Sequence, residues 1–533
     1  MDRSADTIQT IVIYRGKLEL ASEFNSGALQ GSDVTDNPVI RDMDGCAILR
    51  GESLSGLIRQ ELIRLAGYGC RDFTHPGTIV PCSCAVCSLM GHSRIPPDSA
   101  DTGSLQYYSS RLKVSGGRFH NEAARIRHGV AIDRKFAVAA AHKKFDFEAL
   151  MPGATAIFAI EIENPSEDET ALIERLFTGM KYGFLSLGGK KGAGLGAFIL
   201  KECKKRSFDM GARDGVIAYL SKDFQEASEA HVPAPDDKRE SFIEVVCAES
   251  EKRFFHDFRL IIPLDLWFPE LVLFHDPLEA SLVGSDHASI RDKEGNPFLP
   301  PSTIRGVLRS RAEQILRTLN PASACDSAHD AFSCAAKLEA RKKKEEQKGI
   351  DYEPPWEKLE DGTLLCMGCR LFGSAFLGSR LLFQTGAYNR DKNHDEVLQH
   401  FVAIDRFTGG AKEGAKYDAL PLYNVLFSDC KIIIKDFSLW QIGLLALVMK
   451  DVMQSDIRMG FGTRKGYGQA VGIFQRDKTI LLSTSRTICS CRIGDLYNKD
   501  TGVDTTVKMF LEKAVQEFRD MVQKYKGTEY ENV

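Results

Sequence analysis

The sequence predicts an α+β protein built from two copies of one domain. Four short landmarks occur twice in the same order, and the intervals between them mix strand-like and helix-like patterns. Strands and helices mixed in this way are typical of a split βαβ, ferredoxin-like sheet that carries its helices on one face. A repeated order of landmarks indicates an internal duplication, so we treat every element as one of a pair.

The spacing of the four landmarks locates the insertions. The partners are 250 residues apart at the first landmark, 282 at the Cys-x-x-Cys, and 272 at the unchanged Val-Ala-Ile-Asp-Arg and at the glycine-rich basic loop. The second copy therefore gains 32 residues before its Cys-x-x-Cys, and this gain covers 337–361. That stretch is rich in Lys and Glu, which is typical of a solvated helical insert or a disordered loop. The landmark pairs are 36–42 with 286–292, 84–91 with 366–373, 130–134 with 402–406, and 188–196 with 460–468.

These offsets predict a first domain at 1–203 and a second at 253–478. The segment 204–252 between them is charged and contains Pro, which is a linker composition. The remaining segment, 479–533, is expected to be a helical tail, because its apolar residues fall on one face of a helix that could dock on the second domain. Those residues are Val507, Phe510, Leu511, Ala514, Phe518 and Met521.

Each copy is expected to run strand, loop, helix, irregular middle, strand, helix, glycine loop and strand. Ser53 and Ser302 stand near the start of each first helix and are possible N-caps. The expected strands are 11–20 and 156–162 in the first copy, and 258–266 and 431–435 in the second; the expected helices are 52–65 and 171–182, and 302–316 and 439–453.

Composition narrows the class of protein. Hydrophobic content of 43% and charged content of 27% are those of a soluble globular protein. The net charge of −4 means that any binding of nucleic acid must depend on local basic clusters. No apolar run approaches the roughly 20 residues that a membrane span needs, and the first residues lack the pattern of a secretory signal. We therefore expect a cytoplasmic protein of a prokaryotic cell, without a membrane partner.

Fourteen cysteines in a cytosolic protein indicate metal before disulfides. Each copy holds a Cys-x-x-Cys with two further cysteines upstream, and four thiolates complete a tetrahedral zinc site. We expect about one structural Zn²⁺ per domain, with buried free cysteine as the alternative and with His75, His92 or His329 as possible substitute ligands. The other six cysteines are expected in the core. The proposed ligands are Cys70, Cys82, Cys84 and Cys87 in the first copy, and Cys325, Cys334, Cys366 and Cys369 in the second.

Basic residues accompany both glycine-rich loops and both first helices. Successive glycines let a backbone approach a phosphate closely, and flanking lysine or arginine adds charge. Neither loop has the Gly-Lys-Ser/Thr ending of a P-loop, and a tight turn is the alternative interpretation. A helix N-terminus attracts phosphate by itself, although an ordinary solvated face is again the alternative. The residues are Lys190, Lys191, Arg464 and Lys465 in the loops, and Arg50, Arg59, Arg305 and Arg309 at the helices.

A polar turn follows the first strand in each copy. Asp36 lies in the first of these turns and Asp286 in the second. A lone loop aspartate is usually a turn former, so the residues taken alone favour a structural role.

Together, these motifs resemble the repeat-associated mysterious proteins, or RAMP superfamily, that form the backbone of type III CRISPR-Cas effector complexes. The resemblance is carried by the glycine-rich loops, the Ile-Asp-Arg segments, the Leu-Phe-Gly-Ser at 371–374 and the Asp-Asn-Pro-Val at 36–39. The chain is similar to two such subunits fused in tandem, like the double backbone subunit of type III-D systems. The resemblance covers both copies and excludes the linker, the 337–361 insert and the tail.

The resemblance implies an RNA-recognition-like core and a thumb hairpin that presses into guide RNA, matching 130–150 and 402–423. It also implies cleavage of target RNA by an aspartate after the first strand, with Mg²⁺ or another divalent cation, which assigns catalysis to Asp36 and Asp286. Asp286 matches less well, and an alternative alignment on Gly-Ser-Asp pairs it with Asp33. The implied partners are a guide RNA, a complementary target RNA and other type III subunits. The residues expected to contact RNA are Arg50, Ser53, Arg59, Arg134, Lys190, Lys191, Arg305, Arg309, Arg406, Arg464 and Lys465.

Two other functions compete with target cleavage. The chain could be a non-catalytic RNA-binding scaffold whose aspartates are turn residues. It could also be a guide-processing endoribonuclease with a histidine general base, for which His120, His128 and His142 are candidates. No matching histidine is expected in the second copy, which weakens the processing hypothesis.

Overall fold

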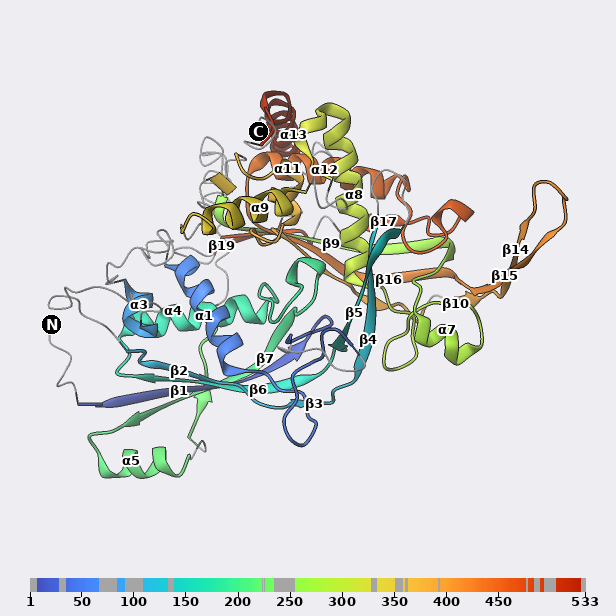
Figure 1. Cartoon of the computed structure of the whole chain (residues 1–533). Helices are drawn as coiled ribbons and strands as arrows, with labels where there is room; N and C mark the ends of the chain where they lie inside the picture. The colour runs from blue at the N-terminus through green and yellow to red at the C-terminus, as the bar shows by residue number, and fades with distance from the viewer. Residues whose placement is uncertain are drawn as a thin grey trace.

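The computed structural model of the chain consists of two mixed sheets, each covered by helices and each carrying a hairpin (Figure 1). The structure describes residues 7–27, 35–66, 84–91, 109–132, 139–222, 224, 226–233, 255–326, 333–349, 358–359, 363–391, 394–475, 478–483, 489–492 and 505–528.

The first sheet is built around one central strand. That strand, β1, pairs antiparallel with β6 on one side and β7 on the other, and β2 adds antiparallel to β6. The short β3 also pairs with β6, and β8 pairs with β7. The strands are β1 (Thr10–Leu20), β2 (Leu112–Ser115), β3 (Phe119–His120), β6 (Thr155–Glu163), β7 (Phe198–Asp209) and β8 (Ser228–Glu229).

The second sheet repeats this arrangement. Its central strand, β9, pairs antiparallel with β16 and β17, and β11 adds antiparallel to β16. Beyond β17, β9 also pairs with β18, which pairs with β19, while β12 and β13 pair with β16. The strands are β9 (Phe255–Val272), β11 (Leu381–Gln384), β12 (Ala387–Tyr388), β13 (Asp395–Glu396), β16 (Leu422–Phe437), β17 (Val471–Phe474), β18 (Ile480–Ser483) and β19 (Cys489–Arg492).

Both sheets share one strand order, in which the second strand of the domain lies beside the third, the third beside the first, and the first beside the fourth. This is the order of a split βαβ, ferredoxin-like sheet, so the predicted α+β class and its duplication are confirmed. The helices between these strands pack on the sheets. They are α1 (Gly51–Leu65), α4 (Glu167–Lys181) and α5 (Arg213–Leu220) in the first domain, and α7 (Pro277–Val283), α8 (Pro301–Leu319), α9 (Cys334–Glu346) and α12 (Leu439–Met453) in the second.

The predicted helix starts need correction. Helix α1 begins at Gly51 after Arg50 and has no side-chain cap, while α8 begins with Pro301, so Ser53 and Ser302 lie inside their helices. Proline suits the first helical position because its fixed φ is already helical and its missing N–H is not needed there. The second helix of the first domain begins at Glu167 and not at 171, because Ser166 and Glu169 form a capping box.

The first sheet extends beyond residue 203, where the predicted linker begins. Strand β7 continues to Asp209 because Cys203 and Phe208 are buried, while Lys205 pairs with Glu174 on α4. Helix α5 and strand β8 follow, so 204–229 forms part of the first domain's sheet region. The charged residues in this stretch produced the linker prediction.

The tail forms α13 (Thr505–Lys524), which packs on α12. Ala514, Phe518 and Val522 are buried in the second core. A Cβ on Gly443 of α12 would lie 2.1 Å from the carbonyl oxygen of Ala514, so this glycine permits the close approach of the two helices. The 337–361 insert contributes most of α9, whose exposed Lys343 pairs with Glu339, as expected of a solvated helix.

A buried group of charges joins the two domains. Glu61 of α1 binds Arg64 of the same helix at 2.6 Å and Arg259 of β9 at 3.0 Å. Arg259 is 1% exposed and lies over the ring of Phe184. Burial alone would raise the pKa of Glu61, but the two arginines outweigh it and lower that pKa to about 2. The ionic contact therefore fixes the two sheets against each other.

Within the described ranges, no helix combines the length and apolar character required to cross a membrane.

Candidate functional site

A two-stranded hairpin grows from each sheet beside the turn that holds the predicted catalytic aspartate (Figure 1). The first hairpin is β4 (Ala124–Ile132) with β5 (Ala139–Leu150), and the second is β14 (Gln399–Ile404) with β15 (Ala411–Leu420). They occupy the two regions where the resemblance to the RAMP superfamily places a thumb.

The first aspartate is held against the base of its hairpin. The backbone N–H of Asp36 donates to Oδ1 of Asp146 at 2.8 Å, and the N–H of Asp146 donates to Oδ2 of Asp36 at 3.3 Å. Asn25 donates to the carbonyl oxygens of Asn37 and Glu148, which clamps the turn to β5. The hydrogen bond from Asp36 and a second from Thr35 lower the pKa of Asp146. The Asp36 side chain remains exposed.

The second aspartate makes the equivalent contact. The N–H of Asp418 on β15 donates to Oδ2 of Asp286 at 2.8 Å. Asp146 and Asp418 are 272 residues apart, which is the offset of the Val-Ala-Ile-Asp-Arg landmark. The geometry therefore pairs Asp36 with Asp286, and Asp33 lies outside the described residues.

The turns that follow the aspartates also agree with this pairing. Asp42 and Asp292 are 250 residues apart, and each accepts from two backbone N–H groups of its own turn. In each turn a glycine stands three residues later with positive φ, at 80° for Gly45 and 82° for Gly295.

The glycine-rich loops close each site from the other side. A Cβ on Gly196 would lie 1.8 Å from the carbonyl oxygen of Leu187, and one on Gly468 would lie 1.9 Å from that of Met459. Both glycines also have positive φ, so the turn itself requires them. Close backbone packing thus accounts for these glycines without a phosphate.

The lysines of these loops rest on aromatic rings of the hairpins. The Lys190 Nζ lies 4.5 Å from the ring centre of Phe145, and the Lys465 Nζ lies 4.2 Å from that of Tyr417. Phe145 and Tyr417 are 272 residues apart and hold matching places on β5 and β15. Each loop therefore brings a cation to the hairpin base near its aspartate. Burial lowers the pKa of Lys191, which lies on the inner side of its loop beside Lys435.

Three of the predicted RNA-contacting arginines have internal partners. Arg59 donates to the carbonyl oxygens of Met90 and Gly91 at 2.7 Å. Arg309, at the same place on α8, donates to Gly373 at 3.3 Å and binds Glu313 at 2.7 Å, and Arg305 donates to Phe372. These side chains bind the carbonyl ends of the Cys-x-x-Cys helices, so their predicted assignment to RNA gives way to a structural one.

The remaining predicted contacts are more exposed. Arg50 pairs with Glu52 at 3.3 Å, and Ser53 is exposed on α1. Arg406, in the turn of the second hairpin, and Arg464, in the second glycine loop, are also exposed. Arg134 lies outside the described residues.

A matched histidine, which the motif comparison missed, stands on each hairpin. His128 is the cross-strand partner of Asp146, and His400 is the partner of Asp418, again 272 residues away. The expectation that no histidine recurs in the second copy is therefore wrong. The repeat His-x-Val-Ala-Ile-Asp-Arg could have revealed it, since each histidine stands two residues before the landmark.

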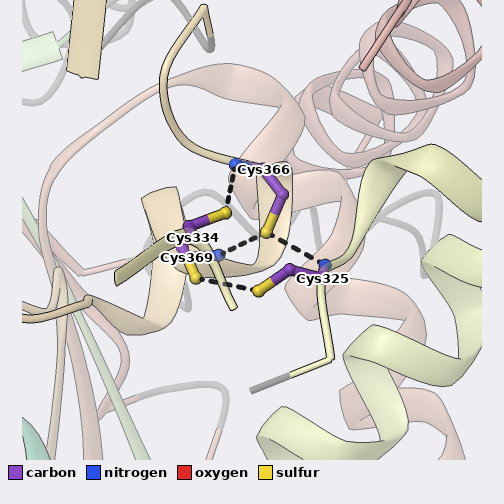
Figure 2. A group of neighbouring side chains, drawn as sticks. All are labelled: Cys325, Cys334, Cys366 and Cys369. Carbon is purple, nitrogen blue, oxygen red and sulfur yellow. Dashed lines mark hydrogen bonds between the residues drawn. The ribbon is translucent and has the colours of Figure 1, made fainter. Parts of the chain in front are cut away.

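Four cysteine side chains of the second domain converge on one point (Figure 2). The sulfurs of Cys325, Cys334, Cys366 and Cys369 lie within 4.8 Å of one another. Cys366 and Cys369 stand at either end of the first turn of α11 (Met367–Phe372), where the Cys369 N–H donates to the Cys366 sulfur at 3.4 Å. Hydrogen bonds from the neighbouring thiols lower the pKa of Cys325, which favours the thiolate that metals bind.

The arrangement fits a structural metal ion such as zinc. Four sulfur donors close a tetrahedral site in which Zn–S distances are about 2.3 Å, and no position remains for a substrate. Three of the four cysteines are buried and one is half-buried. They join the end of α8, the start of α9 and α11, which are separated in sequence, so an ion here would hold the insert against the domain.

The first domain repeats half of this site. Cys84 precedes α3 (Ala85–Met90), and its sulfur accepts from the N–H of Cys87 at 3.4 Å. Cys84 and Cys366 share nearly the same backbone angles, with φ −66° and ψ 157° in one and φ −65° and ψ 162° in the other. Cys70, Cys82 and the possible histidine ligands lie outside the described residues.

The duplicated fold and its landmarks agree with a comparison of the sequence with protein-family models. The RAMP superfamily model matches residues 22–199 and 279–471, which together exceed half of the 533 residues. The chain belongs to the RAMP superfamily. Each match coincides with one sheet and its hairpin, and this membership supports a CRISPR-associated RNA-binding subunit. No curated protein matches the chain.

Proposed function

We propose that this RAMP protein is a guide-RNA-binding backbone subunit of a type III CRISPR effector that cuts complementary target RNA once per domain. The observation that carries the proposal is the pair of exposed carboxylates, Asp36 and Asp286, each set against the base of a projecting hairpin through the same contact. Two equivalent sites in one chain are what cleavage at two regular positions requires.

RNA supplies its own nucleophile, the 2′-hydroxyl, so the protein needs only to position and polarise it. Each aspartate has an exposed carboxylate beside the groove between hairpin and glycine loop, where it can orient a 2′-hydroxyl of a displaced nucleotide. Mg²⁺ commonly uses one or two protein carboxylates, so Asp36 and Asp286 would hold such an ion, which stabilises charge on the phosphate. Lys190 and Lys465 lie on the opposite side, where a cation favours phosphate.

Reconstitution with guide, Mg²⁺ and a labelled target tests the proposal. We expect Asp36→Ala to remove one product and leave its neighbour, and Asp286→Ala to do the reverse. Asp214→Ala, on the exposed face of α5, is the matched control and should keep both products. Fragments with 5′-hydroxyl ends, and loss of one cut when its nucleotide is 2′-deoxy, would identify the attacking group.

Cleavage of both positions by the double variant, with guide and target still bound, would favour the scaffold function. A guide-processing nuclease is the second candidate, favoured by the exposed His128 and His400. It would be supported if the chain alone cut a precursor guide within the repeat. Sequencing the RNA that co-purifies with the chain separates both from an unrelated RNA-binding role, since a uniform repeat-derived tag is expected.

A further inference from the structure

Each hairpin base presents a histidine–aspartate pair that the proposed use of Asp36 and Asp286 leaves unexplained. In the second domain, Nδ1 of His400 lies 2.6 Å from Oδ1 of Asp418. In the first, His128 faces Asp146 as its cross-strand partner. The imidazole of His400 is 58% exposed, so Nε2, on the far side of the ring from the bonded nitrogen, is open to a ligand.

The pair is also next to the proposed catalytic carboxylate. Asp418 receives His400 on its side chain and gives its backbone N–H to Asp286. Asp146 makes the same backbone contact with Asp36. One hairpin residue thus joins an aspartate and a histidine in each domain, at the same offset of 272.

A surface ion pair that stabilises the hairpin is the simpler explanation. Exposed pairs contribute only about 0–1 kcal/mol, which gives little reason for the same pair beside the same aspartate in both copies. A carboxylate on Nδ1, by contrast, fixes the orientation and tautomer of an imidazole that transfers a proton through Nε2. Cleavage by a 2′-hydroxyl requires such a transfer, because the departing 5′-oxygen must be protonated.

We propose that His400 and His128 are general acids for RNA cleavage, with Asp418 and Asp146 as their positioning residues; this rests on the proposed function. The 2′-oxygen forms a bond to phosphorus while the bond from phosphorus to the 5′-oxygen breaks. The 2′-hydroxyl proton passes to the carboxylate of Asp286 or Asp36, or to solvent bound there. The imidazolium gives its Nε2 proton to the 5′-oxygen, which leaves a 2′,3′-cyclic phosphate and a 5′-hydroxyl, and solvent returns the histidine proton.

The test uses the full complex with guide RNA and two versions of one target. One target is all-oxygen, and the other has sulfur in place of the bridging 5′-oxygen at the cut assigned to the second domain. A thiolate leaves without protonation, so a missing general acid matters only for the oxygen target. General acids contribute about 10²–10⁴-fold, so His400→Ala should slow the oxygen cut by about 100-fold or more and return the sulfur cut to within about threefold of wild type.

Matched variants complete the design. His128→Ala should show the same pattern at the other cut, Asp418→Asn should give an intermediate loss, and the exposed His231→Ala should change neither cut. Retention of guide and target, measured on the same samples, shows that the hairpins still fold. Wild-type rates for His400→Ala, or an equal loss with both targets, would overturn the general-acid role.

The two proposals fail in different ways. Loss of cleavage in Asp286→Ala together with full activity in His400→Ala rejects the general acid and keeps the proposed function. Continued cleavage in Asp36→Ala and Asp286→Ala rejects the proposed function itself, whatever the histidine variants do.

Discussion

Hairpin β4–β5 of the first domain lies against the second domain, whereas hairpin β14–β15 extends away from the rest of the described chain (Figure 1). Arg125 on β4 donates to the carbonyl oxygen of Arg291 at 2.7 Å and binds Glu279 of α7. The corresponding place in the second copy is Val397, which is exposed. The same hairpin is therefore a covered contact in one copy and an open surface in the other.

The open hairpin has the features of a surface that another molecule covers. Val402, Ile404 and Phe407 are all exposed, and Phe407 in its turn is fully so. Large apolar side chains gathered on a projecting element are typical of interaction sites. The covered hairpin shows what such an element can contact, namely the turn after the central strand of a neighbouring copy.

The first helices also differ between the copies. Glu61 on α1 faces Arg259 of the other domain, while Arg311, 250 residues later on α8, binds Asp451 of its own domain at 2.7 Å. A charge reversal at one helical position thus turns an interdomain contact into an internal one. Substitutions in the two copies test how far each depends on such differences, from the largest expected effect to the smallest.

The metal centres should give the largest effect. Replacing Cys366 and Cys369 by serine should remove one zinc per chain and destabilise the second domain severely, because structural zinc contributes apparent binding energies of about 10–16 kcal/mol in small domains. Elemental analysis and thermal unfolding measure both. Cys84→Ser with Cys87→Ser should remove a second zinc if the copies are equivalent, and Cys46→Ser should remove none. A folded wild-type chain that contains no metal would contradict the assignment.

The interdomain charges should come next. Glu61→Gln leaves Arg64 and Arg259 buried without their carboxylate, so it should cost roughly 3–5 kcal/mol of unfolding free energy at pH 7, measured with urea. The exposed Glu52→Gln is the control and should change the free energy by less than about 0.5 kcal/mol.

The same contact has a defined pH dependence. The folded-state pKa of Glu61 is about 2, below its ordinary 4.5, so its contribution is full above pH 4.5 and is lost as the pH falls toward 2. Burial raises the pKa of Asp436, which acts in the opposite direction but is present in both proteins. The difference between wild type and Glu61→Gln should therefore shrink by roughly 3 kcal/mol over this window. A constant difference from pH 7 to pH 2 would argue against the ion pair.

The hairpins provide a direct comparison. Arg125→Ala removes charge-assisted hydrogen bonds to Glu279 and Arg291 and should lower stability by about 1.5–3 kcal/mol. Phe407→Ala should leave the stability of the isolated chain within about 0.5 kcal/mol of wild type, because the ring is fully exposed, yet weaken its association with other subunits. Equal losses of stability in the two variants would show that both hairpins are packed within the chain.

The repeat made much of this fold predictable, because offsets of 250 and 272 residues carry each strand and helix of one copy onto the other. Helix boundaries were less predictable: Ser166 and Ser438 form capping boxes, but α1 and α8 begin without any side-chain cap. Local sequence identifies a possible cap, whereas tertiary packing decides where the helix starts.

The site was only half predictable. Asp36 and Asp146 are 110 residues apart, and only the pairing of the turn with the hairpin brings them together. Arg59 and Arg309 were assigned to RNA because they lie near helix starts, but their side chains reach the carbonyl ends of α3 and α11. Charge near a helix start indicates an anion site only if the side chain is not already satisfied by the backbone.

The glycine loops should show the smallest effect, in the salt dependence of guide binding. A single-stranded phosphate contact contributes about 0.7 to the slope of log affinity against log salt, so Arg464→Ala with Lys465→Ala should lower that slope by up to about 1.4. Lys190→Ala should lower it by about 0.7, provided the ammonium over Phe145 also reaches a phosphate. Lys191→Ala is the internal control, because burial beside Lys435 keeps that lysine from the surface that the other three share. Filter binding over a range of salt measures all four. Unchanged slopes throughout would mean that the loops are packing turns, as Gly196 and Gly468 alone would allow, and that RNA is held by the exposed arginines of the hairpin and first helix.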